Sequence, residues 1–190
     1  MNSDLLFQNI RSKVDVSPDE FEAMKGAFRY TSIKKGDLLV TEEGLNDKMF
    51  FIEKGLLFSY KTLDSGEVQV IQFAKENFWM ADLCSFFSGS TALFTIKALE
   101  NCALWEISRS RFEAVCGRFP KMESFFRINF QHSYVNTLVR LSDAYSKDTE
   151  ARYRALVEKQ PDLLQRVPQY LIASYLGVLP SSLSRIRNKD

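Results

Sequence analysis

The chain has 190 residues, a length that can bury one large core or two smaller ones. Hydrophobic residues make up 45% and charged residues 26% of it, an ordinary composition for a globular protein. The formal net charge is only +1, so the chain as a whole is no polycation. Any binding of nucleic acid must therefore come from a local basic patch.

The histidine and cysteine content argues against enzyme and metal chemistry. His132 is the only histidine, which speaks against a catalytic triad and against a histidine-bound metal. The three cysteines, Cys84, Cys102 and Cys116, are widely spaced, which favours reduced thiols over disulfides or an iron–sulfur centre. No signal peptide or membrane-spanning run is visible. The sequence therefore predicts a cytoplasmic protein with no catalytic residues, no metal, no cofactor and no membrane partner.

The first 28 residues are expected to be helical from Asp4 onward. Ser17 and Glu20 have the spacing of a capping box, and Pro18 suits the first helical position.

From Tyr30 the pattern changes to short runs of β-branched and aromatic residues separated by turns. Asp64-Ser65-Gly66 reads as a hairpin turn. The expected strands are Tyr30–Ile33, Leu38–Thr41, Lys48–Glu53, Leu56–Thr62, Val68–Ala74, Thr95–Ala98 and Ala103–Ile107. Many short strands at this spacing indicate a β-sandwich or a double-sheet roll, not a parallel sheet that alternates with helices.

A short helix, Ser110 to Cys116, is expected after the strands, and a long one from Lys121 to about Ser146. The apolar residues of the long helix follow one stripe: Phe126, Phe130, Tyr134, Leu138, Leu141 and Tyr145. Such a stripe could lie on the β-roll or pair with its twin in a second copy of the chain. A further helix is expected from about Asp148 to Gln160, capped by Asp148 or Thr149.

The last part of the chain reads as two short helices around a tight turn. Pro168 and Pro180 suit the first turns of these helices, and Gly177 stands where the chain must adopt a positive φ. The apolar positions, Ile172, Ala173, Leu176, Leu183 and Ile186, would pack the two helices together. This arrangement is a helix-turn-helix, although an ordinary helical hairpin with a solvated outer face has the same pattern.

The outer face of the second helix carries hydrogen-bonding and cationic side chains. They are Ser181, Ser182, Ser184, Arg185, Arg187, Asn188 and Lys189. These groups suit contacts to base edges and phosphates, so we predict that all but Asn188 bind DNA.

The chain resembles the Crp–Fnr superfamily of bacterial transcription regulators over nearly its whole length, and its C-terminal part is similar to short members from Bacteroidetes. The residues that carry the resemblance are Ile172-Ala173-Ser174-Tyr175-Leu176-Gly177-Val178 with Leu183-Ser184-Arg185-Ile186, the pairs Gly36-Asp37, Glu43-Gly44 and Lys54-Gly55, and Glu106-Ile107-Ser108-Arg109-Ser110-Arg111-Phe112. The resemblance implies an α+β fold in three parts. Residues 1–118 would form a cyclic-nucleotide-binding-like β-roll (a jelly roll or double-stranded β-helix), 119–146 a dimerisation helix, and 147–190 a winged-helix-like helix-turn-helix domain.

The family also implies partners. It implies a homodimer through the long helix, with Phe126, Phe130, Tyr134, Leu138 and Leu141 in the seam. It implies double-stranded DNA with a pseudo-palindromic site, read by Arg185, and RNA polymerase as a further partner. The segment between Pro161 and Val167 is too short for the β-hairpin that many members place before the motif.

The sensor pocket departs from the family. Cyclic-nucleotide-binding members carry a Gly-Glu pair for the ribose and an Arg-Ser or Arg-Thr pair for the phosphate. These pairs fall on Ala81-Asp82 and Ala92-Leu93, and a buried phosphate without a cation is prohibitively desolvated. We therefore expect an effector other than cyclic AMP bound in the usual way. The degenerate pocket would consist of Ala81, Asp82, Leu83, Ala92, Leu93 and Thr137.

The aromatic segment 78–87 beside this pocket is either a filled core or a site for an apolar ligand. The function expected from the whole sequence is a dimeric, sequence-specific DNA-binding transcription regulator with an unidentified small-molecule effector. The alternative is a sensor of a cyclic nucleotide or another small ligand whose helical end contacts proteins. A metal-dependent enzyme is not expected, because the roll lacks histidines.

Overall fold

A computed structural model describes residues 4–187 of the chain. The chain divides into two compact units. The first combines Met1–Ser59 with Phe73–Gln131, and the second combines Tyr60–Gln72 with His132–Asp190. Each unit is described separately below.

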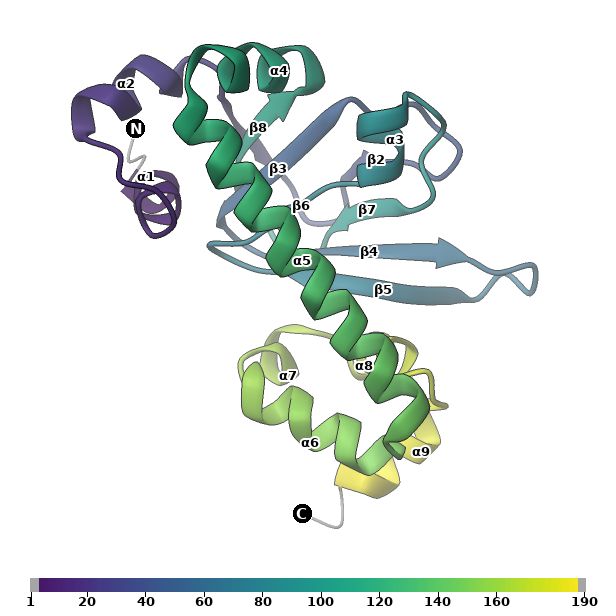
Figure 1. The fold of residues 1–190 in the computed structure, drawn as a ribbon. Helices are drawn as coiled ribbons and strands as arrows, with labels where there is room; N and C mark the ends of the chain where they lie inside the picture. Colours follow the sequence, from purple (N-terminus) through teal and green to yellow (C-terminus); the bar gives the residue numbers. More distant parts are fainter. Residues whose placement is uncertain (1–3, 188–190) are drawn as a thin grey trace. The chain divides into compact units, whose positions relative to one another are not determined.

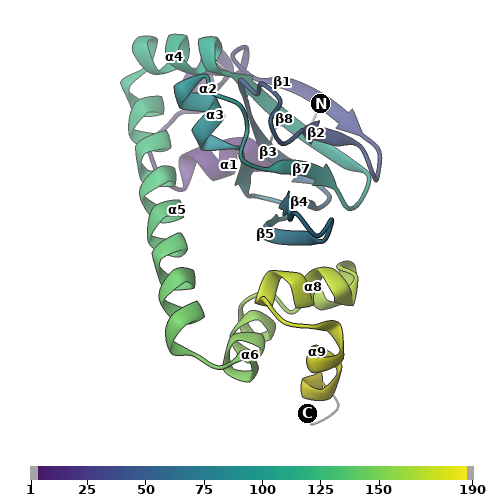
Figure 2. The same ribbon diagram turned by 90° about the vertical axis from the view of Figure 1, so that its right-hand side faces the viewer.

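The strands form two four-stranded sheets (Figures 1 and 2). The first has the order β1 (Arg29–Ile33), β8 (Cys102–Ser108), β3 (Lys48–Lys54) and β6 (Trp79–Met80). The second has the order β2 (Leu38–Val40), β7 (Thr95–Ala98), β4 (Leu57–Thr62) and β5 (Val68–Ala74). β8 is antiparallel to both neighbours, with Trp105 opposite Tyr30 and Phe51. These bounds confirm the expected strands to within one or two residues.

The core of the first unit is strongly aromatic. The ring of Trp79 lies 5.3 Å from Phe51, 6.0 Å from Phe125 and 5.4 Å from Phe126, measured between ring centroids. Phe51, Phe86 and Phe125 are fully buried. Buried aromatic surface on this scale is the main stabilising contribution in the unit.

Helices cover this core. They are α1 (Asp4–Arg11), α2 (Pro18–Lys25), α3 (Leu83–Ser88), α4 (Arg109–Arg118) and the first half of α5 (Pro120–Ser146). The capping box is confirmed: Ser17 Oγ accepts from the Glu20 backbone N–H at 3.2 Å, and the Ser17 N–H donates to Glu20 Oε2 at 2.8 Å. The short elements β6 and α3 lie in the aromatic segment that the sequence left without secondary structure.

The second unit holds the C-terminal helices and the tip of the β4–β5 hairpin. Its helices after α5 are α6 (Thr149–Lys159), α7 (Leu163–Arg166), α8 (Gln169–Leu176) and α9 (Pro180–Arg187). Asp148 caps α6, since its Oδ1 accepts from the Ala151 N–H at 2.8 Å. Among residues 4–187 no strand follows β8. The segment between Pro161 and Val167 was expected to be too short for a β-hairpin, and it forms the short helix α7. The expected α+β fold is confirmed.

Within the described range, no helix is both long enough and apolar enough to cross a membrane.

Candidate nucleic-acid interface and sensor pocket

The turn between α8 and α9 depends on Gly177. Its φ of +69° is in the left-handed region, where a side chain is strained. The Gly177 N–H donates to the Ser174 carbonyl at 3.0 Å, and the Val178 N–H donates to the Ala173 carbonyl at 3.0 Å. These bonds end α8 and redirect the chain into α9.

Small and apolar side chains hold the two helices against each other. Ala173 and Leu183 are fully buried, and Ile172 is nearly so. Because Ala173 has no atoms beyond Cβ, it allows the backbone of α9 to approach α8. The packing is therefore that of a helix-turn-helix, with the opposite face of α9 left in solvent.

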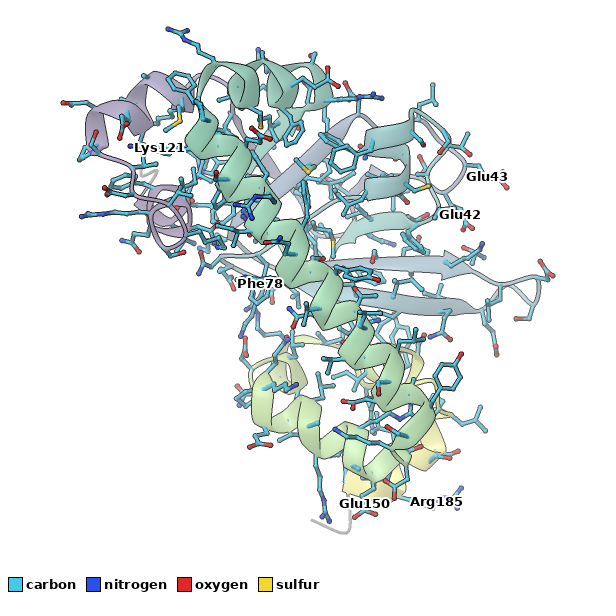
Figure 3. All side chains as sticks on the ribbon, in the orientation of Figure 1. Glu42, Glu43, Phe78, Lys121, Glu150 and Arg185 are labelled. Atoms are coloured by element: carbon cyan, nitrogen blue, oxygen red, sulfur yellow. The ribbon has the colours of Figure 1, made fainter. Side chains whose placement is uncertain are left out.

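Most of the predicted DNA-binding residues on α9 are exposed. Ser181, Ser184, Arg185 and Arg187 are exposed, and Ser182 is half-buried. The labelled side chain of Arg185 extends outward from the second unit (Figure 3). Lys189, the last predicted contact, lies outside the described residues.

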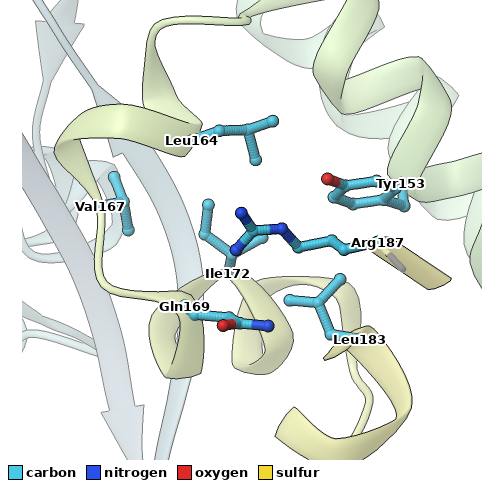
Figure 4. A pocket seen from close by; sticks show the side chains of 7 residues that line it. All are labelled: Tyr153, Leu164, Val167, Gln169, Ile172, Leu183 and Arg187. Carbon is cyan, nitrogen blue, oxygen red and sulfur yellow. The ribbon is translucent and has the colours of Figure 1, made fainter. Parts of the chain in front are cut away.

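Arg187 has a different environment from Arg185. It lines a small cavity of about 50 Å³ together with Tyr153, Gln169 and Ile172. Figure 4 shows its guanidinium group turned toward Ile172. A cavity of this size holds a water molecule but no effector. Arg187 thus lines this cavity while its side chain remains exposed to solvent.

The second half of α5 presents an unusual exposed apolar surface. Tyr134 is 65% exposed, Leu138 44% and Leu141 51%. Val135 and Val139 are exposed beside them. Every residue from 131 to 142 is exposed, His132 included. A helix with so much uncovered apolar surface needs a partner.

The structure separates the predicted seam into two parts. Phe126 is only 2% exposed and packs against Phe112, Trp79 and Phe125 inside the first unit. It is therefore removed from the surface that a second copy could reach. Phe130 is half-buried at the edge of the same cluster. The exposed stripe begins at Tyr134 because α5 leaves the core of the first unit at that point.

Asp82, the residue predicted at the position of the family's ribose-binding carboxylate, is 1% exposed. Its Oδ1 accepts from the Ser85 N–H at 2.9 Å and caps α3. Its Oδ2 accepts from the N–H groups of Leu93 at 2.7 Å and Phe94 at 3.0 Å. Three backbone N–H groups thus donate to one carboxylate. These bonds connect the start of α3 to the segment that leads into β7.

The other predicted pocket residues do not form an enclosed site. Ala81 is half-buried and Ala92 is buried, whereas Leu83 and Leu93 are 37% and 46% exposed. Thr137 belongs to the second unit, and its hydroxyl donates to the Ser133 carbonyl of its own helix.

The aromatic segment 78–87 lies partly in the core. Trp79 and Phe86 belong to the aromatic cluster, and Trp79 Nε1 donates to Asn9 Oδ1 at 3.1 Å, which satisfies its one polar group. Phe78 and Phe87 are partly exposed at 45% and 42%.

A separate open hollow of about 350 Å³ lies beside α3. Its polar lining includes Asn46, Asp47, Ser85, Ser90 and Arg109. The Arg109 side chain is paired with Glu113 at 3.0 Å. No sequence pattern predicted this hollow, since its walls come from three separate segments. Its volume is at the lower end of the range for small-molecule sites.

Two of the three thiols are held protonated by burial. Burial raises the pKa of the Cys116 thiol to about 11, with a smaller contribution from the Glu123 carboxylate. Burial likewise raises the pKa of Cys102. Residues 4–187 contain no group of three or more histidine, cysteine and acidic side chains placed to hold a metal ion.

Comparisons with known proteins agree with this architecture. Residues 30–119 match the cyclic nucleotide-binding domain family. A search of curated protein sequences finds no match.

Several solved structures share the fold over most of the chain. The c-di-GMP-responsive global regulator CLP of Xanthomonas campestris is 12% identical, with 91% of both chains covered and a TM-score of 0.74. A CooA mutant from Carboxydothermus hydrogenoformans is 15% identical, with 100% of this chain and 84% of that chain covered and a TM-score of 0.70. A protein described as a transcriptional regulator of the Crp/Fnr family from Eubacterium rectale is 13% identical, with coverages of 92% and 83% and a TM-score of 0.67.

Residues 30–119 thus match the cyclic nucleotide-binding domain family, and the chain shares its fold with Crp–Fnr transcription regulators. The resemblance to this superfamily seen in the sequence is confirmed at the level of the fold.

Proposed function

We propose that the protein is a dimeric, sequence-specific DNA-binding transcription regulator with a β-roll sensor domain. The observation that carries the proposal is the α8–Gly177–α9 motif, whose exposed face carries Arg185 together with Ser181 and Ser184. A fold shared with known regulators supports it.

The second half of α5 supports a homodimer. Tyr134, Leu138, Leu141 and Tyr145 follow each other at steps of four, three and four residues, which is the spacing of a coiled-coil seam. All four are exposed in one copy of the chain. Pairing with the same helix of a second copy would remove this apolar surface from water.

A dimer of this kind presents two α9 helices to two half-sites, so its DNA site is pseudo-palindromic. In each half-site Arg185 would donate two hydrogen bonds to one guanine, because its forked guanidinium matches the guanine O6 and N7 acceptors. Ser181, Ser182, Ser184 and Lys189 would contact neighbouring bases and phosphates. RNA polymerase is a further proposed partner once DNA is bound.

The effector is proposed to be something other than a cyclic nucleotide bound in the family's usual way. Ala92 and Leu93 offer no cation for a phosphate, and the N–H groups of Leu93 and Phe94 already donate to Asp82. An incoming phosphate would have to displace a buried carboxylate and would meet its negative charge.

Selection from a duplex library with a randomised 30-base-pair centre tests the function. We expect the purified full-length protein to enrich a two-fold symmetric motif whose half-sites each contain a guanine. Arg185→Ala should relax the preference at that guanine. Recovery of no motif from repeated rounds at moderate salt would contradict specific DNA binding.

The alternative function is a small-ligand sensor whose helical end contacts proteins. The 350 Å³ hollow beside α3 favours it, because that hollow has both apolar and polar walls. A protein of this kind would enrich no duplex in the same selection.

A further inference from the structure

One side chain of the helix-turn-helix pairs with the backbone of a β-strand. The Ser174 hydroxyl, on α8, accepts a hydrogen bond from the Val70 N–H at 2.9 Å and donates one to the Val68 carbonyl at 2.6 Å. The Gln69 side chain, between those two residues, donates to the Ser174 carbonyl at 2.5 Å. All four residues belong to the second unit.

This contact satisfies backbone hydrogen-bonding groups of both β5 and α8. β5 is the edge strand of its sheet, so alternate N–H and C=O groups on its outer side have no neighbouring strand. Val68 and Val70 are two residues apart and present such groups, which the Ser174 hydroxyl satisfies as donor and acceptor.

The Ser174 carbonyl lies in the last turn of α8, where carbonyls lack a full intrahelical partner. It already accepts the N–H of Gly177 at 3.0 Å, the bond that forms the turn of the motif. The Gln69 amide supplies a second donor to the same oxygen. The strand thus contacts one of the two carbonyls that form the turn into α9.

The next residue of α8 is held from another direction. The guanidinium of Arg140, on α5, lies 5.0 Å from the ring centroid of Tyr175, a cation–π contact. Ser174 and Tyr175 differ by about 100° around the helix axis. α8 is therefore fixed by the hairpin on one side and by α5 on another.

We propose that the Ser174 contact with β5 is a latch that holds the helix-turn-helix in its DNA-reading orientation. Ser184 and Arg185 are exposed while the latch is closed, so the reading face of α9 is free in the latched state. A motif that is ordered before it meets DNA loses less conformational freedom on binding.

The latch also connects the strands of the roll to the helix-turn-helix, so a structural change in the roll could affect the motif without involving α5. Strands β4 and β5 run without interruption from Ser59 and Phe73 of the first unit into the hairpin tip of the second. A shift of either strand in the roll would therefore be transmitted to Ser174. This inference rests on the proposed DNA-binding function.

Amide exchange of the full-length protein tests the contact itself. Ser174→Ala removes both hydroxyl bonds at a helical position that alanine suits. We expect the Val70 amide to exchange roughly tenfold faster in this variant, as expected for loss of one hydrogen bond. Ser174→Thr keeps a hydroxyl and should restore part of the protection. Ser146→Ala removes an exposed hydroxyl that bonds only within α5, and it should leave Val70 unchanged.

The affinity of the same variants for the most enriched duplex tests the role of the latch. Ser174→Ala should bind about three- to tenfold more weakly than wild type, with the same sequence preference. Unchanged exchange at Val70 would overturn the contact. Faster exchange with equal or tighter DNA binding would overturn its preordering role. A wild-type protein that binds no duplex specifically would overturn the proposed function and the preordering role together, whereas the exchange result would still decide whether the contact exists.

Discussion

The Oδ2 atom of Asp82 lies 2.7 Å from the backbone nitrogen of Leu93. The two residues are eleven positions apart, and the bond closes the loop that follows α3. In related cyclic-nucleotide sites the same two positions would serve the ligand. Here the Asp82 carboxylate accepts hydrogen bonds from the backbone of Leu93 and Phe94, so it stabilises the segment between α3 and β7.

Removing this carboxylate should destabilise the roll. Asp82→Ala leaves the Ser85, Leu93 and Phe94 N–H groups without their acceptor, so we expect a loss of about 2–4 kcal/mol in the free energy of unfolding. Urea denaturation followed by tryptophan fluorescence would measure it. Asp64→Ala, at the exposed hairpin turn, is the matched control and should change stability by less than about 0.5 kcal/mol. If Asp82→Ala lowered the free energy of unfolding by less than about 0.5 kcal/mol, the hydrogen bonds of Asp82 would not be needed for stability.

Cyclic AMP should bind weakly or not at all. The phosphate would face Ala92 and Leu93 without a cation, and it would compete with Asp82 for the same donors. Isothermal titration with cyclic AMP to about 1 mM should therefore show no saturable heat. A dissociation constant of about 1 mM corresponds to a binding free energy of about −4 kcal/mol, so any binding would be weaker than this. Stoichiometric binding at micromolar concentration would reverse this interpretation of the pocket.

The roll and the helix-turn-helix could be predicted because their signals are local. Alternating strands, the Ser17–Glu20 capping box and Gly177 between two apolar helical faces each specify structure within a few residues. The short elements β6 and α3 were not predicted, because each is too short for a hydrophobic period to show. The local signals of α3 are its caps, Asp82 before it and Gly89 after it.

The roles of individual side chains were harder to predict where partners are distant in sequence. Spacing alone placed Phe126 in the same stripe as Tyr134, but the first unit buries one and leaves the other exposed. The bond between Ser174 and Val70 joins residues 104 positions apart, and no pattern in either segment indicates it. No pattern in the sequence indicated that Arg187, an exposed residue, also lines a cavity with Tyr153 and Ile172.

The three thiols should react at very different rates. Cys84 is exposed, whereas burial raises the pKa of Cys116 to about 11 and also raises that of Cys102. At pH 8 a group with a pKa of about 11 is roughly 0.1% thiolate, and the thiolate is the reactive form. Titration with a chromogenic disulfide should show one fast thiol, which Cys84→Ser removes. Two fast thiols in the folded protein would contradict the burial of Cys116 or Cys102.

The apolar stripe of α5 should hold the dimer. Leu138→Glu places a charge in the middle of the proposed seam, where its desolvation would oppose pairing with the same helix of a second copy. Sedimentation velocity at micromolar concentration should show a dimer for wild type and a monomer for this variant. Asn136→Glu, on the polar side of the same helix, is the control and should remain dimeric. A wild-type monomer at that concentration would contradict the seam.

The two arginines of α9 should have separable effects. Arg185 is exposed on the reading face, so Arg185→Ala should cost about 1–3 kcal/mol against the selected duplex and abolish discrimination at one base pair of each half-site.

Arg187 lines the cavity beside Tyr153 and Ile172, so Arg187→Ala should lower the thermal stability of the helix-turn-helix more than it changes base preference. Fluorescence anisotropy against the selected duplex and against single-base variants of it separates affinity from preference, and circular dichroism measures the melting. Loss of base discrimination in Arg187→Ala would contradict this assignment. The Arg187 guanidinium would then have to leave the cavity when DNA binds, and Arg187 would replace Arg185 as the base-reading arginine.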